Sequence, residues 1–158
     1  MKPKSQLPIT DTNSMIFFNV DSDHFLLFCE GGRKLCFSGQ IQPGHNLPPE
    51  LTMLDFGTSS RCHYWKTAMS YDPIENSIYW SNGCGDIYKG PLTSGVHQAV
   101  IRNSKRITDI EIDIVGRNIY FTAQHSNTIR VATLDGSFQT VIVQVQSPQG
   151  LALDSTSG

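Results

Sequence analysis

Three aspartates at equal spacing are the feature that most restricts how this chain can fold. Asp72, Asp113 and Asp154 follow one another at intervals of 41 residues. Residues 72–81 align with residues 113–122, and both segments end in a β-branched and aromatic run. A period of about forty residues indicates supersecondary units that bury their apolar faces only by stacking on one another. The sequence therefore predicts an array of repeats.

Each repeat has the pattern of four short strands separated by turns. Apolar residues alternate with others before each aspartate, as in Met69-Ser70-Tyr71, which is the period of a strand with one apolar face. The predicted strands cover 69–71, 78–81, 87–92 and 98–101 in one copy and 110–112, 119–122, 129–134 and 139–143 in the next. Pro91 cannot donate to a ladder, so we expect the third strand to be irregular or at an edge there. Four strands in about forty residues predict an all-β protein made of propeller blades.

Bulk properties exclude several function classes. The 158 residues carry 12 basic and 14 acidic side chains, so the chain offers no basic field for a phosphate backbone and we expect no nucleic-acid partner. The apolar stretches fall short of the roughly 20 residues that a membrane helix needs. The N-terminus has no apolar region of the kind found in a signal peptide. Any membrane span or targeting segment is therefore expected outside this sequence.

The four cysteines leave their pairing open. Cys29, Cys36, Cys62 and Cys84 allow two disulfides in three connectivities, and no pair has the Cys-x-x-Cys spacing of zinc or redox sites. Cys29 and Cys36 flank a Glu-Gly-Gly-Arg segment that favours a hairpin, which would bring them near each other. Two buried thiols on strands are the alternative.

No catalytic or cofactor motif is present in the sequence. It lacks a Gly-x-Ser-x-Gly elbow, a phosphate-binding glycine loop and a His-Glu-x-x-His pair. The five histidines are scattered, and Asp21-Ser22-Asp23 lacks the glycine and distal glutamate of a calcium loop. The repeated aspartates precede turns, where a short acceptor usually binds nearby backbone amides. We therefore expect no enzyme activity, no cofactor and no metal.

The order of motifs resembles a known family. Asp72, the run Ile78-Tyr79-Trp80-Ser81-Asn82 and the later Leu134-Asp135-Gly136-Ser137 resemble the YWTD repeat, also called the class B repeat, of low-density-lipoprotein receptor relatives. Residues 24–28, His-Phe-Leu-Leu-Phe, resemble the strand that opens such propellers in the epidermal growth factor precursor. The resemblance implies an incomplete propeller over 24–158, with repeats at about 67–107, 108–148 and a truncated 149–158, after an N-terminal segment 1–23. The family propeller has six blades, and fewer than four fit here.

The resemblance also implies which residues carry the architecture. Aromatic residues on inner strands more often form the core between blades than a stacking platform for bases or sugars. The motif's own aspartate, which helps tie blades together in the family, is Asn82 in one copy and Ala123 in the other. The implied structural residues are Asp72, Tyr79, Trp80, Asp113, Tyr120, Phe121 and Asp154.

As to function, the resemblance implies an extracellular protein-interaction module, a fragment of a cell-surface receptor that binds or releases a protein ligand. His125, on a turn, is the candidate for a charge change in acidic endosomes of the kind used by the receptor family. The alternatives are a propeller hydrolase with a central cation, a sevenless-type receptor kinase and a nidogen-like matrix protein. An unclosed propeller also exposes strand edges and apolar faces, which favours self-association.

Overall fold

A computed structural model describes residues 68–91, 96–102, 104 and 106–154 in full, together with the backbone of four strands between residues 12 and 55. The described part contains twelve strands in three four-stranded antiparallel sheets and one short 3-10 turn, η1 (Gln124–Ser126). None of its helical segments is long and apolar enough to cross a bilayer. The all-β class and the incomplete propeller expected from the sequence are confirmed, with three sheets where fewer than four blades were expected.

The first sheet begins upstream of the motif resemblance. Its strands pair in the order in which they occur along the chain. The resemblance would begin the propeller near residue 24, but the strand at Thr12–Val20 pairs along its length with the next strand and belongs to the same sheet. A strand belongs to a sheet because its backbone pairs with a neighbouring strand, and this pairing does not require a repeat motif in the sequence. The strands are β1 (Thr12–Val20), β2 (Asp23–Glu30), β3 (Leu35–Ile41) and β4 (Thr52–Asp55).

The second and third sheets repeat the same hairpin order at the spacing of the aspartates. Every strand predicted for these two repeats is present, with ends that differ by a few residues. Pro91 is the last residue of its strand and lies beyond the pairing with the fourth strand, as its missing N–H requires. The second sheet contains β5 (Met69–Asp72), β6 (Ser77–Ser81), β7 (Ile87–Pro91) and β8 (Gln98–Ile101). The third contains β9 (Ile107–Asp113), β10 (Asn118–Ala123), β11 (Thr128–Thr133) and β12 (Gln139–Gln144).

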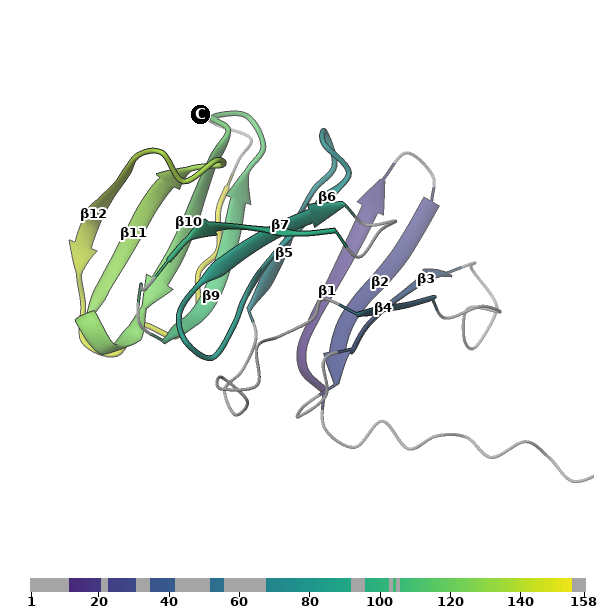
Figure 1. Ribbon diagram of the computed structural model, residues 1–158, viewed down its shortest axis with the longest axis horizontal. Helices are drawn as coiled ribbons and strands as arrows, with labels where there is room; N and C mark the ends of the chain where they lie inside the picture. Colours follow the sequence, from purple (N-terminus) through teal and green to yellow (C-terminus); the bar gives the residue numbers. More distant parts are fainter. Residues whose placement is uncertain are drawn as a thin grey trace, which may run out of the picture.

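The three sheets stand side by side in chain order, as blades do (Figure 1). Adjacent sheets meet chiefly through their first strands, β5 against β9, so these are the inner strands, and β4, β8 and β12 are the outer ones. The core between the second and third sheets is formed by buried apolar side chains from both. They include Tyr79, Ile87, Ile101, Ile107, Ile110, Ile112, Ile119, Phe121, Ala132 and Leu134.

After β12 the chain returns to the inner edge of the third sheet. The Thr108 hydroxyl donates to the Pro148 carbonyl at 2.9 Å, and the Leu151 amide donates to Asp109 Oδ2 at 2.6 Å. Residues 148–154 have no regular secondary structure, although they align with the opening strand of a further repeat. They therefore lie beside β9.

Candidate functional site: a loop face joined by ion pairs

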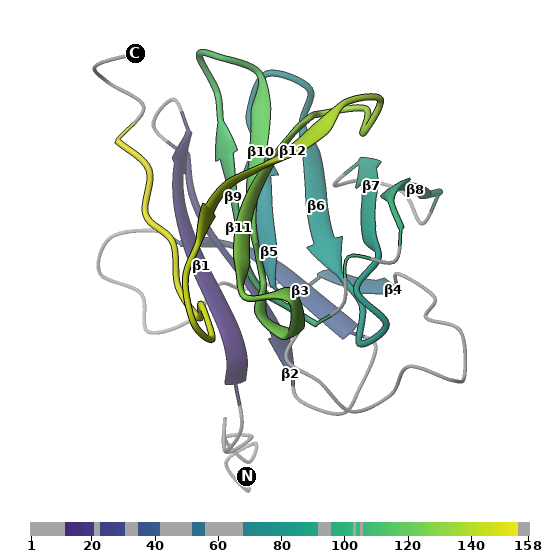
Figure 2. The same ribbon diagram turned by 90° about the vertical axis from the view of Figure 1, so that its left-hand side faces the viewer.

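Antiparallel order places alternate connections at the same end of the sheets. The β5–β6 and β9–β10 turns meet at one end together with the β7–β8 and β11–β12 loops, and Figure 2 shows these two turns at the top. The described residues of this end are 73–76, 96–97, 114–117 and 134–138, and we refer to them as the turn face. The turns after β6, β8 and β10 lie at the opposite end.

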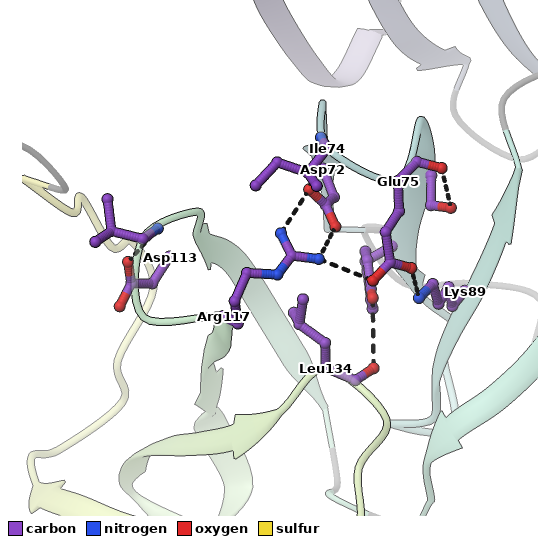
Figure 3. Close-up of polar contacts among 10 residues, drawn as sticks. Asp72, Ile74, Glu75, Lys89, Asp113, Arg117 and Leu134 are labelled. Atoms are coloured by element: carbon purple, nitrogen blue, oxygen red, sulfur yellow. Dashed lines mark hydrogen bonds and ion pairs between the residues drawn. The ribbon is translucent and has the colours of Figure 1, made fainter.

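A buried ion pair joins the second and third sheets beneath the turn face (Figure 3). The guanidinium of Arg117, on the β9–β10 turn, donates to both carboxylate oxygens of Asp72, at 2.9 Å from Nη1 and 2.6 Å from Nη2. The side chain of Asp72 is fully buried and that of Arg117 is 32% exposed. Asp72 Oδ1 also accepts from the Ile74 amide at 3.0 Å. A paired and hydrogen-bonded carboxylate of this kind can stay charged in a buried position.

The ion pair extends into a chain of polar contacts along the same seam. Arg117 Nη2 also donates to Glu75 Oε1 at 2.8 Å, and the other oxygen of Glu75 binds Lys89 Nζ. Lys89 Nζ lies 5.4 Å from the centre of the Tyr79 ring, whose hydroxyl donates to the Leu134 carbonyl of the third sheet at 3.4 Å. These contacts connect the β5–β6 and β9–β10 turns with strands β6 and β7.

The charges of this cluster change the proton affinity of its carboxyls. Burial by itself would raise the pKa of Asp72, but the Arg117 guanidinium and the backbone amides hold that pKa below its usual value. The hydrogen bond from Lys89 lowers the pKa of Glu75, with a further contribution from Arg117. Both carboxylates are ionised at neutral pH, and neither has the raised pKa of a general acid.

Four exposed apolar side chains lie on the turn face. Ile74 is 64% exposed and Val115, its equivalent in the next repeat, is 69% exposed. Val96 and Phe138, on the loops that precede the outer strands, are 76% and 61% exposed. These are the most exposed large apolar residues in the described part of the chain. An exposed apolar group beside ordered charges has the composition of a protein-binding surface.

The two repeated aspartates of the described sheets have related but unequal roles. Asp113 Oδ1 accepts from the amides of Val115 and Gly116 at 3.1 and 2.9 Å, as Asp72 does from its own turn. Only Asp72 receives an arginine from the next sheet. Asp154 is exposed and lies outside any strand.

Three of the four aromatic residues singled out in the sequence are buried. Tyr79 and Phe121 are fully buried, and Tyr120 is half-buried. Trp80 is buried and stacks on Tyr88 with ring centres 5.8 Å apart. The buried rings therefore belong to the sheets and offer no open platform for a ligand.

Sequence reasoning missed Arg117, which forms the ion pair between these sheets. Asn82, at the motif position expected to tie blades, binds within its own turn by accepting from the amides of Cys84 and Asp86. The tie is supplied instead by Arg117. The only sequence signal was an arginine in a turn where the preceding repeat has Asn76.

The remaining candidates contribute no further chemistry to the turn face. Within the described ranges no three His, Cys, Asp or Glu side chains are grouped so that they could hold a metal ion. His125 is exposed on η1, at the end opposite the turn face. Cys84 forms a disulfide, and the side chains of Cys29, Cys36 and Cys62 lie outside the described residues, as does the Asp21-Ser22-Asp23 segment.

Comparison with known proteins places these features among propellers. No family model matches the chain. It is 28% identical over 143 residues to the low-density lipoprotein receptor-related protein 5 of Mus musculus, a match that covers 85% of this chain and 8% of the relative. The human protein of that name is 31% identical over 100 residues, which cover 58% of this chain and 6% of the relative. The chain thus spans less than a tenth of the length of either relative.

Solved structures give the same architecture. A chain of a nidogen/laminin complex superposes with a TM-score of 0.69 at 22% identity, covering 85% of this chain and 50% of that one. A periplasmic gluconolactonase from Pseudomonas aeruginosa superposes with a TM-score of 0.60 at 15% identity, covering 88% and 41%. At these identities the likeness is one of fold.

Proposed function

The chain is a partial propeller of low-density-lipoprotein-receptor class B (YWTD) repeats, and on that basis we propose that it binds a protein ligand through its turn face. Its setting is an extracellular or cell-surface protein related to the lipoprotein receptors. In that setting the module takes part in ligand binding or release.

The observation that carries this proposal is the position of the exposed apolar residues. Ile74 and Val115 occupy equivalent places on adjacent turns, so a partner that spans the two sheets meets both. Binding surfaces commonly combine a few apolar anchors with a polar rim. Here Glu75 and Arg117 supply the rim, and their mutual ion pair orders both side chains before a partner arrives. Such pre-organisation reduces the entropy lost on binding.

Two further observations support this setting. Cys84 is oxidised to a disulfide, and stable disulfides are characteristic of secreted and cell-surface proteins. One relative is named as a lipoprotein receptor-related protein, and one similar structure comes from a complex of nidogen with laminin. A matrix protein of the nidogen kind is therefore a variant of the same proposal. The lactonase likeness concerns the fold only and names no catalytic residue here.

Surface plasmon resonance tests the proposal with laminin and low-density lipoprotein particles as the immobilised probes. The double variant Ile74→Asp/Val115→Asp places charge on both apolar anchors. It is expected to raise the Kd for a probe that the unmodified chain binds by about tenfold or more. Val145→Asp, at the opposite end of the third sheet, is the matched control and should leave binding unchanged. Equal affinities for the double variant and the unmodified chain would rule out the turn face. Failure to bind either probe would count against laminin and low-density lipoprotein as ligands of this chain.

A further inference from the structure

The β6–β7 turn contains the one Asn-Gly pair of the sequence, Asn82-Gly83. The side-chain amide of an asparagine is open to attack by the backbone nitrogen of the next residue, and glycine hinders that attack least because it has no Cβ. The turn lies at the end of the sheets opposite the turn face. Asn82 also stands where the family repeat has its own aspartate, so a change from amide to carboxylate here would restore the residue type of the motif.

The turn holds the Asn82 side chain against its own backbone. Oδ1 of Asn82 accepts from the Cys84 amide at 3.0 Å and from the Asp86 amide at 2.9 Å. The first bond closes an Asx turn, a ring that contains both the amide carbon Cγ and the Gly83 nitrogen. The Gly85 amide donates to the Asn82 carbonyl at 3.1 Å, and the disulfide of Cys84 restrains the same turn. The two atoms that would react are therefore kept near each other, as a near-attack geometry requires.

The hydrogen bonds of the turn also suit the charges of such a reaction. Negative charge develops on Oδ1 when Cγ is attacked, and the two backbone amides that already donate to this oxygen would stabilise it, as in an oxyanion hole. The attacking Gly83 amide makes no hydrogen bond within the described part of the chain, so it has none to lose. The leaving nitrogen, Nδ2, donates to Asp86 Oδ2 at 3.3 Å, which places a carboxylate able to carry a proton beside it. Asn82 is only 6% exposed, but Cys84 is exposed, so water reaches the turn.

We propose that Asn82 is a site of spontaneous deamidation. The Gly83 nitrogen forms a bond to Cγ of Asn82 and gives up its proton, the bond between Cγ and Nδ2 breaks, and the amide nitrogen leaves with that proton as ammonia. Water then opens the resulting succinimide at either of its two carbonyls. The products are an aspartate or an isoaspartate at position 82.

Either product changes the turn. An aspartate still accepts from the two backbone amides but cannot donate to Asp86, so two carboxylates face each other where an amide met a carboxylate. An isoaspartate lengthens the main chain beside the pair of Ser81 with Ile87, which is the last pair of β6 with β7 before the turn. The modification therefore adds a negative charge and weakens the connection between these two strands.

Peptide mapping by mass spectrometry tests the proposal on the full chain after incubation in heavy-oxygen water at neutral pH, because each deamidation adds one heavy oxygen atom to the product. Asn76 is the internal reference. Its Oδ1 accepts from the Tyr71 hydroxyl alone, and its neighbour Ser77 has a Cβ and lies in β6. Asn82 is expected to react about tenfold or more faster than Asn76, since a single donor to the developing oxyanion is worth at least that much. It should also react at least as fast in the folded chain as in a synthetic peptide of residues 78–88.

Gly83→Ala places a Cβ beside the attacking nitrogen and should slow the reaction at Asn82 by about tenfold or more. The described glycines with positive φ are Gly85 and Gly136, so the backbone at Gly83 accepts alanine, and urea unfolding checks that the variant stays folded. Gly150→Ala makes the same change outside the turn and should leave the rate unchanged. A slower reaction in the folded chain than in the peptide would show that the turn protects Asn82 and would overturn the proposal. A rate no higher than that of Asn76, or an unchanged rate in Gly83→Ala, would overturn it as well.

Discussion

The tie between the second and third sheets rests on the Arg117–Asp72 pair, and removing the guanidinium should destabilise the chain measurably. Arg117→Met keeps the apolar stem but leaves the carboxylate of Asp72 buried and without its cation. Breaking a buried ion pair in this way costs about 3–5 kcal/mol in the free energy of unfolding. Since Arg117 is 32% exposed and Asp72 keeps the Ile74 amide, we expect the lower limit, about 3 kcal/mol.

Urea unfolding followed by tryptophan fluorescence measures this change, because Trp80 is buried in the second sheet. Arg102→Met makes the same chemical change at an exposed arginine and should shift the free energy by less than about 0.5 kcal/mol. In a double-mutant cycle with Asp72→Asn, the two losses should fall well short of adding. A loss below about 1 kcal/mol for Arg117→Met would refute the assignment of this pair as the main polar tie.

The remaining predictions concern pH, packing and metal binding. Because the pKa of Asp72 is lowered in the folded state, its ionised carboxylate stabilises the fold above the ordinary pKa of about 3.9, and this stabilisation is lost as pH falls through the folded pKa. The difference in unfolding free energy between the unmodified chain and Arg117→Met should therefore shrink in acid titrations below about pH 4. Gly136→Ala, at φ 73° and against the Val100 carbonyl, should cost about 2–4 kcal/mol in thermal unfolding, whereas Gly150→Ala, whose new Cβ would meet nothing nearer than 3.8 Å, should be nearly neutral. Phe121→Ala should cost about 3–5 kcal/mol by the same assay, and a smaller loss would show that the core collapses around it. Calorimetry with calcium should show no tight binding, and a strong signal would favour the hydrolase alternative.

Local patterns predicted the strands well because strand and turn preferences act over a few residues. The turn after each aspartate is an example. Asn76 and Arg117 occupy the same place in the two repeats and both have positive φ, 47° and 55°. Asparagine tolerates this conformation, whereas arginine there costs about 1 kcal/mol or more. The turn itself could be read from the spacing, but the choice of arginine could not.

The role of that arginine depends on the neighbouring sheet. Asn76 accepts a hydrogen bond from Tyr71 of its own sheet at 2.7 Å, while Arg117 reaches across to Asp72, 45 residues earlier in the chain. Repeats that are equivalent in sequence therefore differ in what they contact. The partner of a side chain at the inter-sheet seam is set by the stacking of whole sheets, which no local period encodes.

The sequence by itself determined the repeat unit and the four strands of each repeat, because a 41-residue period and two-residue alternation are properties of neighbouring residues. Tertiary structure alone decided that Arg117 joins two sheets, that Ile74 and Val115 lie on the same end of adjacent sheets and that the loop containing Gly136 packs against β8. Each of these depends on how one sheet packs against the next, and hence on contacts between residues distant in the chain.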